Sequence, residues 1–154
     1  MDNLSAANAG TVKVGIFTVN RLGFGAMRIT GKGIWGPPAD AEVAKQVLKR
    51  AIELDVNFVD TADAYGPEVS ENLIHDALAP YEGIIVATKG GTKRGGPGDW
   101  RPDGTPKHLR EACEASLKRL GVQQIVVYQF HRPDPNVPFK DSLQTLIDLQ
   151  SEGK

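Results

Sequence analysis

The chain has 154 residues, of which 40% are apolar and 24% are charged, and this composition is typical of one globular domain, not of a disordered or fibrous segment. The formal net charge is -1 at pH 7 and no basic run occurs, which argues against a nucleic-acid or anionic-membrane partner. Cys113 is the only cysteine and the three histidines are scattered, so we expect no disulfide and no metal site. The sequence shows neither an apolar signal segment nor an apolar run of about 18 residues, and we expect a cytoplasmic protein.

The beginning of the chain predicts a flexible tail followed by a hairpin. Residues 1–10 are small and polar, and we expect them to be flexible, with the folded domain spanning residues 11–154. Residues 11–19 alternate apolar and polar side chains around Gly15 and Ile16, a pair that suits a two-residue type II′ turn.

Four strand-then-helix units follow in chain order. Strands are predicted at residues 21–27, 56–60, 84–88 and 125–130, and helices after Asp40, from Ser70, after Thr105 and around Leu143 to Ile147. Asp40 and Thr105 have the side chains of N-cap residues, and Gly121 stops the third helix. In the first helix, apolar residues repeat at i,i+4 along two ridges, one through Val43 and Val47. Alternating strands and helices predict the α/β fold class, with a parallel sheet covered by helices.

Ionisable residues stand at the ends of three predicted strands. Asp60 ends the second strand, Lys89 follows the third, and His131 follows the fourth. In α/β sheets and barrels, ligands bind and catalytic residues lie at the carboxyl edge of the strands. Tyr65 lies on the loop just after Asp60. The four side chains together predict a proton-transfer site.

The chemistry of such a site centres on the phenol of Tyr65. A phenol has an ordinary pKa of about 10 and is a poor acid near neutral pH. We expect the Lys89 ammonium to lower this pKa, and the Asp60 carboxylate to keep that ammonium charged and oriented. A neutral His131 can donate an N–H to a substrate carbonyl oxygen. Taken singly, Asp60 fits a turn carboxylate and Lys89 a solvated charge, but their joint placement favours the functional interpretation.

The Gly-rich residues 90–104 predict a flexible loop that closes over or binds a ligand. Two tryptophans, Trp35 and Trp100, stand in Gly- and Pro-rich loops on the same side of the predicted sheet. Together with Arg94 and Arg101 they suggest a pocket mouth that favours aromatic carbonyls carrying negative charge.

Five stretches of the chain resemble the aldo-keto reductases. They are RLGFGAM at 21–27, FVDTADAYG at 58–66, ATKGG at 87–91, SLKRLG at 116–121 and FHRPDP at 130–135. The resemblance extends from about Thr11 to the end of the chain, and the second stretch is the most specific. Residues 33–38 (GIWGPP) are similar to the branch that includes pyridoxal reductases.

The resemblance implies a (β/α)₈ TIM barrel that reduces aldehydes or ketones with NADPH. It places the family's catalytic tetrad at Asp60, Tyr65, Lys89 and His131, with Tyr65 as the proton donor. It places contacts to the nicotinamide ribose at Gly25, Ala26, Met27 and Asp60.

A barrel of this kind takes about 250 residues, and this chain carries the hairpin and the first four βα units. We therefore expect the N-terminal half of the barrel, without most of the groups that hold the rest of the cofactor. Two alternatives to a reductase remain open. The half-barrel could be a protein-binding or assembly unit that self-associates through exposed barrel edges, or the protein could be a regulatory homologue without turnover.

Overall fold

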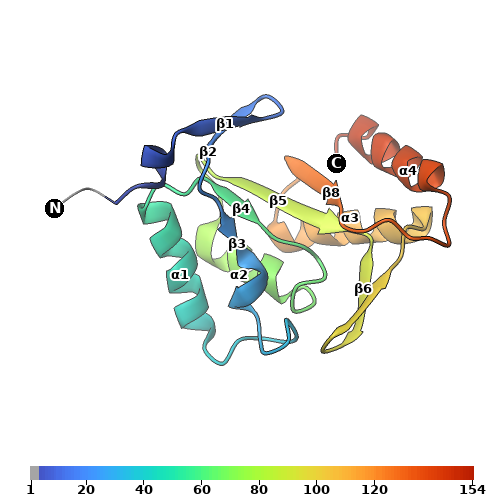
Figure 1. Ribbon diagram of the computed structural model, residues 1–154, viewed down its shortest axis with the longest axis horizontal. Coiled ribbons are helices and arrows are strands. Elements are labelled where there is room, and N and C mark those ends of the chain that lie inside the picture. Colours follow the sequence, from blue (N-terminus) through green and yellow to red (C-terminus); the bar gives the residue numbers. More distant parts are fainter. Residues whose placement is uncertain (1–3) are drawn as a thin grey trace.

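A computed structural model describes residues 4–154, which fold around a four-stranded parallel sheet (Figure 1). The strand order is β3-β4-β5-β8, with bounds Phe24–Gly25, Phe58–Asp60, Ile85–Gly90 and Val127–Phe130. Each strand is followed by a helix, namely α1 at Ala41–Glu53, α2 at Val69–Leu78, α3 at Pro106–Leu120 and α4 at Phe139–Ser151. Consecutive helices pack against one another, so the predicted α/β class with a parallel, helix-covered sheet is confirmed.

The main hydrophobic core lies between the sheet and this row of helices. Its members come from β4 and β5 and from the inward faces of all four helices, among them Leu48, Val59, Ile74, Val86, Cys113, Leu120 and Leu149. The local signals for two helices act as expected. The Asp40 carboxylate accepts a hydrogen bond from the Val43 N–H at the start of α1, and Gly121 ends α3 with a φ of 67°.

The first strand of the sheet is shorter than the sequence predicts. Only Phe24 and Gly25 pair with β4, and residues 26–29 form the 3-10 helix η2 (Ala26–Ile29) in place of the end of a strand. The Ala26 carbonyl accepts a hydrogen bond from the Ser70 hydroxyl at 3.1 Å, so it has a partner without the strand ladder. Ala26 is fully buried in this turn.

The N-terminal hairpin is confirmed, whereas the tail before it is more ordered than expected. Strands β1 (Thr11–Val14) and β2 (Phe17–Asn20) pair antiparallel, with a φ of 60° at Gly15. Residues 6–9 form the 3-10 helix η1 (Ala6–Ala9), capped by Ser5, and the Ala6 N–H donates to the Leu54 carbonyl at 2.7 Å. Residues 5–9 thus have defined backbone structure where the sequence analysis expects a flexible tail, and residues 1–3 lie outside the described part.

The Gly-rich segment after β5 is also ordered. It forms an antiparallel hairpin of β6 (Thr92–Gly96) and β7 (Asp99–Pro102) that projects from the carboxyl edge of the sheet (Figure 1). The expectation of a flexible loop at 90–104 is wrong because backbone pairing and side-chain contacts to other loops hold this segment, as described below.

Apolar side chains remain exposed on the two outermost helices of the row. On α1, the ridge through Val43 and Val47 does not join the core, and these side chains are 52% and 44% exposed. On α4, Leu143 and Ile147 are 43% and 45% exposed. These helices follow the two edge strands of the sheet, β3 and β8. No helix within residues 4–154 is long and apolar enough to cross a membrane.

Behind the sheet, one buried ion pair links α2, α3 and β5. The fully buried Glu71 carboxylate accepts from the Arg119 Nε at 2.6 Å and from the Thr88 hydroxyl at 2.5 Å. A buried charge that loses its partner costs far more than an exposed one, because no water replaces the lost contact. The position of β5 therefore depends on this contact.

We predict that Arg119→Met lowers the free energy of unfolding by about 3–5 kcal/mol, because it leaves the Glu71 carboxylate buried without its cation. The control is Arg110→Met on the same helix, which removes a solvent-accessible pair with Glu152 and should cost far less, because water screens that pair. Urea unfolding followed by circular dichroism measures both. Equal losses in the two variants would contradict this role of the Glu71 pair.

Candidate active site

The structure brings the predicted residues Asp60 and Lys89 into direct contact at the carboxyl edge of the sheet. The Lys89 Nζ donates to Asp60 Oδ2 at 2.6 Å and to the Thr61 carbonyl at 2.7 Å. The Lys89 side chain is 13% exposed and that of Asp60 35%. Strand register produces this contact, because Asp60 pairs with Ala87 and Lys89 is two residues further along β5, on the same face.

Tyr65 lies beside this ion pair, on the turn that leads from β4 to α2. Its side chain is 7% exposed, and the Lys89 Nζ is 5.3 Å from the centre of its ring. The next residue, Gly66, has a φ of 100°, and a side chain there would place a Cβ 2.5 Å from the Cβ of Val69. The tight turn that positions Tyr65 thus requires glycine at position 66.

The electrostatics of Tyr65 differ from the sequence prediction. Its pKa is raised above the ordinary value, first by burial and second by the negative charge of Asp60. The net direction is opposite to the lowering expected from Lys89, because burial and the charge of Asp60 outweigh any effect of the ammonium. Tyr65 therefore stays protonated at neutral pH.

His131 completes the group and is held by backbone. The backbone N–H of His131 donates to the Gly90 carbonyl at 2.9 Å. The centre of its ring is 5.7 Å from the centre of the Tyr65 ring, and the two rings are nearly perpendicular. Burial, together with the positive charges of Lys89 and Arg132, lowers the pKa of His131 to about 4. The imidazole is thus neutral at pH 7, as the sequence analysis expects. Tyr65 and His131 line a cavity of about 210 Å³ with Met27, Trp100 and Arg132.

The residues expected near a nicotinamide ribose lie at the same edge. Gly25 pairs with Asp60 in the strand register, and a Cβ at Gly25 would meet no atom within 4 Å. Ala26 is buried, while Met27 lines the cavity with Tyr65. Open space beside Gly25 and Asp60 fits the approach of a ribose. Among residues 4–154, no group of three His, Cys, Asp or Glu side chains could hold a metal ion.

The expected pocket mouth is only partly present. Trp100 lines the cavity, but the guanidinium of Arg94 donates to five backbone carbonyls, and Arg101 pairs with Asp99 at 2.6 Å. The donors of Arg94 are thus taken up by backbone carbonyls, and neither Arg94 nor the exposed Arg101 lines the cavity. The cation that lines the cavity is Arg132, which the sequence analysis did not single out. Its position directly after His131 is the only signal that could have identified it.

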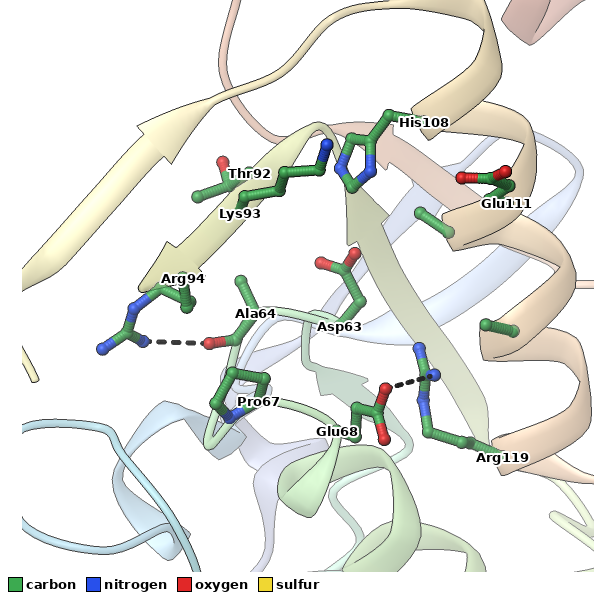
Figure 2. Close-up of a pocket in the computed structure, with 12 residues that line it drawn as sticks. Asp63, Ala64, Pro67, Glu68, Thr92, Lys93, Arg94, His108, Glu111 and Arg119 are labelled. Carbon is green, nitrogen blue, oxygen red and sulfur yellow. Dashed lines mark hydrogen bonds and ion pairs between the residues drawn. The ribbon is translucent and has the colours of Figure 1, made fainter. Parts of the chain in front are cut away.

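A second pocket of about 290 Å³, lined in part by charged side chains, lies beside the site, between the turn before α2, the hairpin β6–β7 and α3 (Figure 2). Asp63 points into it, facing His108, and Arg119 lies near Glu68 at its lower side (Figure 2). Burial and the charge of Glu71 raise the pKa of Asp63 to about 7. Within the described residues, the Asp63 Oδ1 has no hydrogen-bond partner. The sequence gives no sign of this burial, since Asp63 reads as one more polar loop residue.

The chain shares its sequence and fold with known reductases. Residues 21–154 match the model of the Aldo/keto reductase family. The chain belongs to this family. It is 56% identical over 150 residues to an uncharacterized oxidoreductase of Schizosaccharomyces pombe, and 37% identical over 153 residues to pyridoxine 4-dehydrogenase of Escherichia coli. These matches cover 97% and 95% of this chain.

Solved structures of the family match over nearly the whole chain. The glycerol dehydrogenase of Gluconobacter oxydans has a TM-score of 0.83 at 31% identity, and an aldo-keto reductase of Bacillus halodurans in its holo form has 0.78 at 29%. They cover 95% and 93% of this chain but are themselves covered to 46% and 47%. The chain spans 49% and 54% of the two sequence relatives named above. It therefore has the aldo-keto reductase fold over about half the length of its relatives.

We predict that the His131 imidazole titrates near pH 4 in the folded chain, well below its ordinary value of 6.5. Because the folded state then binds fewer protons than the unfolded state, His131 lowers stability as pH falls from about 6.5 toward 4. Lys89→Met should raise this pKa, since it removes a nearby positive charge. Nuclear magnetic resonance of the ring nitrogens measures both values. A His131 pKa near 6.5 in the parent chain, or no change in the variant, would contradict the description of the site.

Proposed function

We propose that this site reduces an aldehyde or ketone to an alcohol with NADPH as the reductant. The observation that carries the proposal is the Lys89–Asp60 ion pair beside a protonated Tyr65 and a neutral His131. Membership of a reductase family supports it, as does the relative that is a pyridoxine 4-dehydrogenase. NADPH as the cofactor and a cytoplasmic location are both parts of this proposal. The location is supported by a single cysteine, which is buried.

Each side chain has a distinct part in this reaction. The cofactor, when bound, supplies the hydride that the carbonyl carbon accepts. Neutral His131 donates an N–H to the carbonyl oxygen and stabilises the negative charge that develops there. Tyr65 gives its hydroxyl proton to that oxygen, and the alcohol leaves a tyrosinate behind. Lys89 holds its ammonium beside this tyrosinate, and Asp60 orients the ammonium throughout.

The chain's own residues fit one end of the cofactor. Gly25, Ala26, Met27 and Asp60 would face the nicotinamide ribose, because Gly25 leaves open space and Asp60 offers a carboxylate beside it. In this proposal, these four residues contact neither the pyrophosphate nor the 2′-phosphate of the cofactor. We therefore expect the 154-residue chain to bind NADPH weakly.

We predict that Tyr65→Phe lowers kcat for aldehyde reduction by about 10²–10⁴, because it removes the proton donor and no binding group. Cofactor affinity should stay within a few-fold. The control is Tyr128→Phe, which removes a buried hydroxyl that has no partner among the described residues and lies behind the sheet. Steady-state kinetics with NADPH and cofactor titration test the assignment. Retained turnover in Tyr65→Phe would exclude Tyr65 as the donor.

A second candidate function, assembly with another copy of the chain, rests on the exposed apolar ridges of α1 and α4. Edge strands β3 and β8 have a neighbour on one side only, and such strands pair readily with another chain. Val47 and Leu143 are exposed beside these edges. If β3 of one copy pairs with β8 of a second copy, two-fold symmetry makes the remaining β8 and β3 edges pair as well, so one partner could cover both edges.

We predict that the chain self-associates and that the double substitution Val47→Glu with Leu143→Glu weakens this association at least ten-fold. The physical reason is that carboxylates would have to lose water in an apolar contact. Ile16→Glu is the control, because Ile16 is 86% exposed at the tip of the β1–β2 hairpin, outside both ridges. Sedimentation velocity over a range of concentrations measures the effect. A parent chain that stays monomeric would rule out this function.

A further inference from the structure

The Arg94 side chain ties the hairpin β6–β7 to two loops that are distant in sequence. Its Nη1 donates to the carbonyls of Ile34 and Ala64, both at 2.9 Å, and the second contact is drawn in Figure 2. Its Nη2 donates to the Gly33 carbonyl at 3.3 Å. Two further bonds, to the carbonyls of Gly96 and Asp99, stay within the hairpin. One guanidinium thus bridges three backbone segments at the edge of the site.

The same guanidinium lies against two indole rings. Its central carbon is 3.6 Å from the centre of the Trp100 ring and 5.5 Å from that of the Trp35 ring. The Trp35 segment is itself joined to the tight turn after Tyr65 by a β-bridge to Gly66. Arg94 therefore fixes the face of Trp100 through a planar cation–aromatic contact and connects it to the loop carrying Trp35.

The contacts of Arg94 with Trp100 and with the Ala64 carbonyl both lead to Tyr65 and His131, the residues proposed to bind the substrate carbonyl. Trp100 meets the Tyr65 ring at 6.4 Å and the His131 ring at 6.3 Å, edge to face in each case. Ala64, whose carbonyl receives a bond from Arg94, directly precedes Tyr65 in the chain. Three aromatic rings thus form the walls of the small cavity, and Arg94 sets the position of one wall directly and of a second through the backbone.

The charge of Arg94 does not explain its presence here. Its donors meet neutral backbone carbonyls, while the carboxylate of Asp99 on the same hairpin bonds to Arg101. The planar guanidinium, with its fork of donors, can bind several carbonyls and stack on a ring at the same time. Arg94 therefore fixes the positions of the backbone segments and of the Trp100 ring relative to one another. Lysine keeps the charge but has neither the fork nor the flat face.

We propose that Arg94 is a positioning residue of the carbonyl pocket, which holds Trp100 against Tyr65 and His131 and thereby adapts the pocket to flat, aromatic aldehydes. The substrate class follows from three perpendicular rings around one cavity, which offer edges and faces to a planar substituent and little to a flexible one. This inference rests on the proposed reductase function, and the experiment separates the two.

The first measurement needs no turnover. In a chain carrying Trp35→Phe, Trp100 is the only tryptophan and reports its own surroundings through fluorescence quenching by acrylamide. Adding Arg94→Lys should raise the quenching constant at least two-fold, because the indole loses the group that covers its face. Arg101→Lys is the matched control, because it is the same change on the same hairpin at a residue whose side chain, within residues 4–154, bonds to Asp99 alone. Equal quenching in the two variants would overturn the proposal.

The second measurement is kinetic, with Trp35 intact. Arg94→Lys should lower kcat/KM for benzaldehyde at least ten-fold, and that for propanal less than three-fold, because only the aromatic substrate uses the Trp100 wall. Arg101→Lys should change neither. A uniform loss for both aldehydes would show a merely structural role and overturn the proposal. A parent chain without turnover would count against the proposed function alone, and the fluorescence comparison would still decide the role of Arg94.

Discussion

The contact between Lys89 and Asp60 is the interaction on which the arrangement of the site depends. An ammonium that is only 13% exposed needs a carboxylate within hydrogen-bond reach, because burying a charge without a partner is costly. The contact spans two neighbouring strands, so it forms only in the register that aligns Asp60 with Ala87. It also has effects beyond its two members. Asp60 helps to raise the pKa of Tyr65, and Lys89 helps to lower that of His131.

The residues around the Lys89–Asp60 pair are held in place by contacts on both faces of the sheet. Behind β5, the Thr88 hydroxyl bonds to the buried Glu71, which pairs with Arg119, and Thr88 is the neighbour of Lys89 in the strand. In front, the tight turn at Gly66 and the bridge to the Trp35 segment position Tyr65. The helices therefore fix the strand that carries the cation, whereas loops and the hairpin fix the phenol. The relative position of Lys89 and Tyr65 therefore depends on the helices on one side of the sheet and on the loops and hairpin on the other.

Sequence reasoning located the candidate side chains better than their electrostatics. Asp60, Lys89 and His131 could be placed together because the ends of parallel strands meet at one edge, and this depends only on strand order. The pKa of Tyr65 could not be predicted, because it depends on how deeply the ring is buried and, after that, on the distance to Asp60. The hairpin at 92–102 was missed because its glycines resemble a flexible loop. Part of what holds it is Arg94, whose carbonyl acceptor on Ile34 lies 60 residues away in the chain.

A raised pKa at Tyr65 is compatible with proton donation once the order of events is considered. Before negative charge develops on the substrate, a phenol whose pKa is raised above the ordinary value of about 10 stays protonated at neutral pH. Tyr65 thus keeps the proton that it later donates. When the carbonyl oxygen becomes an alkoxide, its conjugate acid is an alcohol, which is a far weaker acid than a phenol, so the proton moves downhill even from a weakened phenol. The neutral His131 then matters most, because it stabilises the oxygen while the charge builds up. A site of this kind needs no ionised tyrosine beforehand. It needs a fixed distance between phenol, imidazole and carbonyl, and the surrounding ion pair, turn and hairpin hold the first two in place.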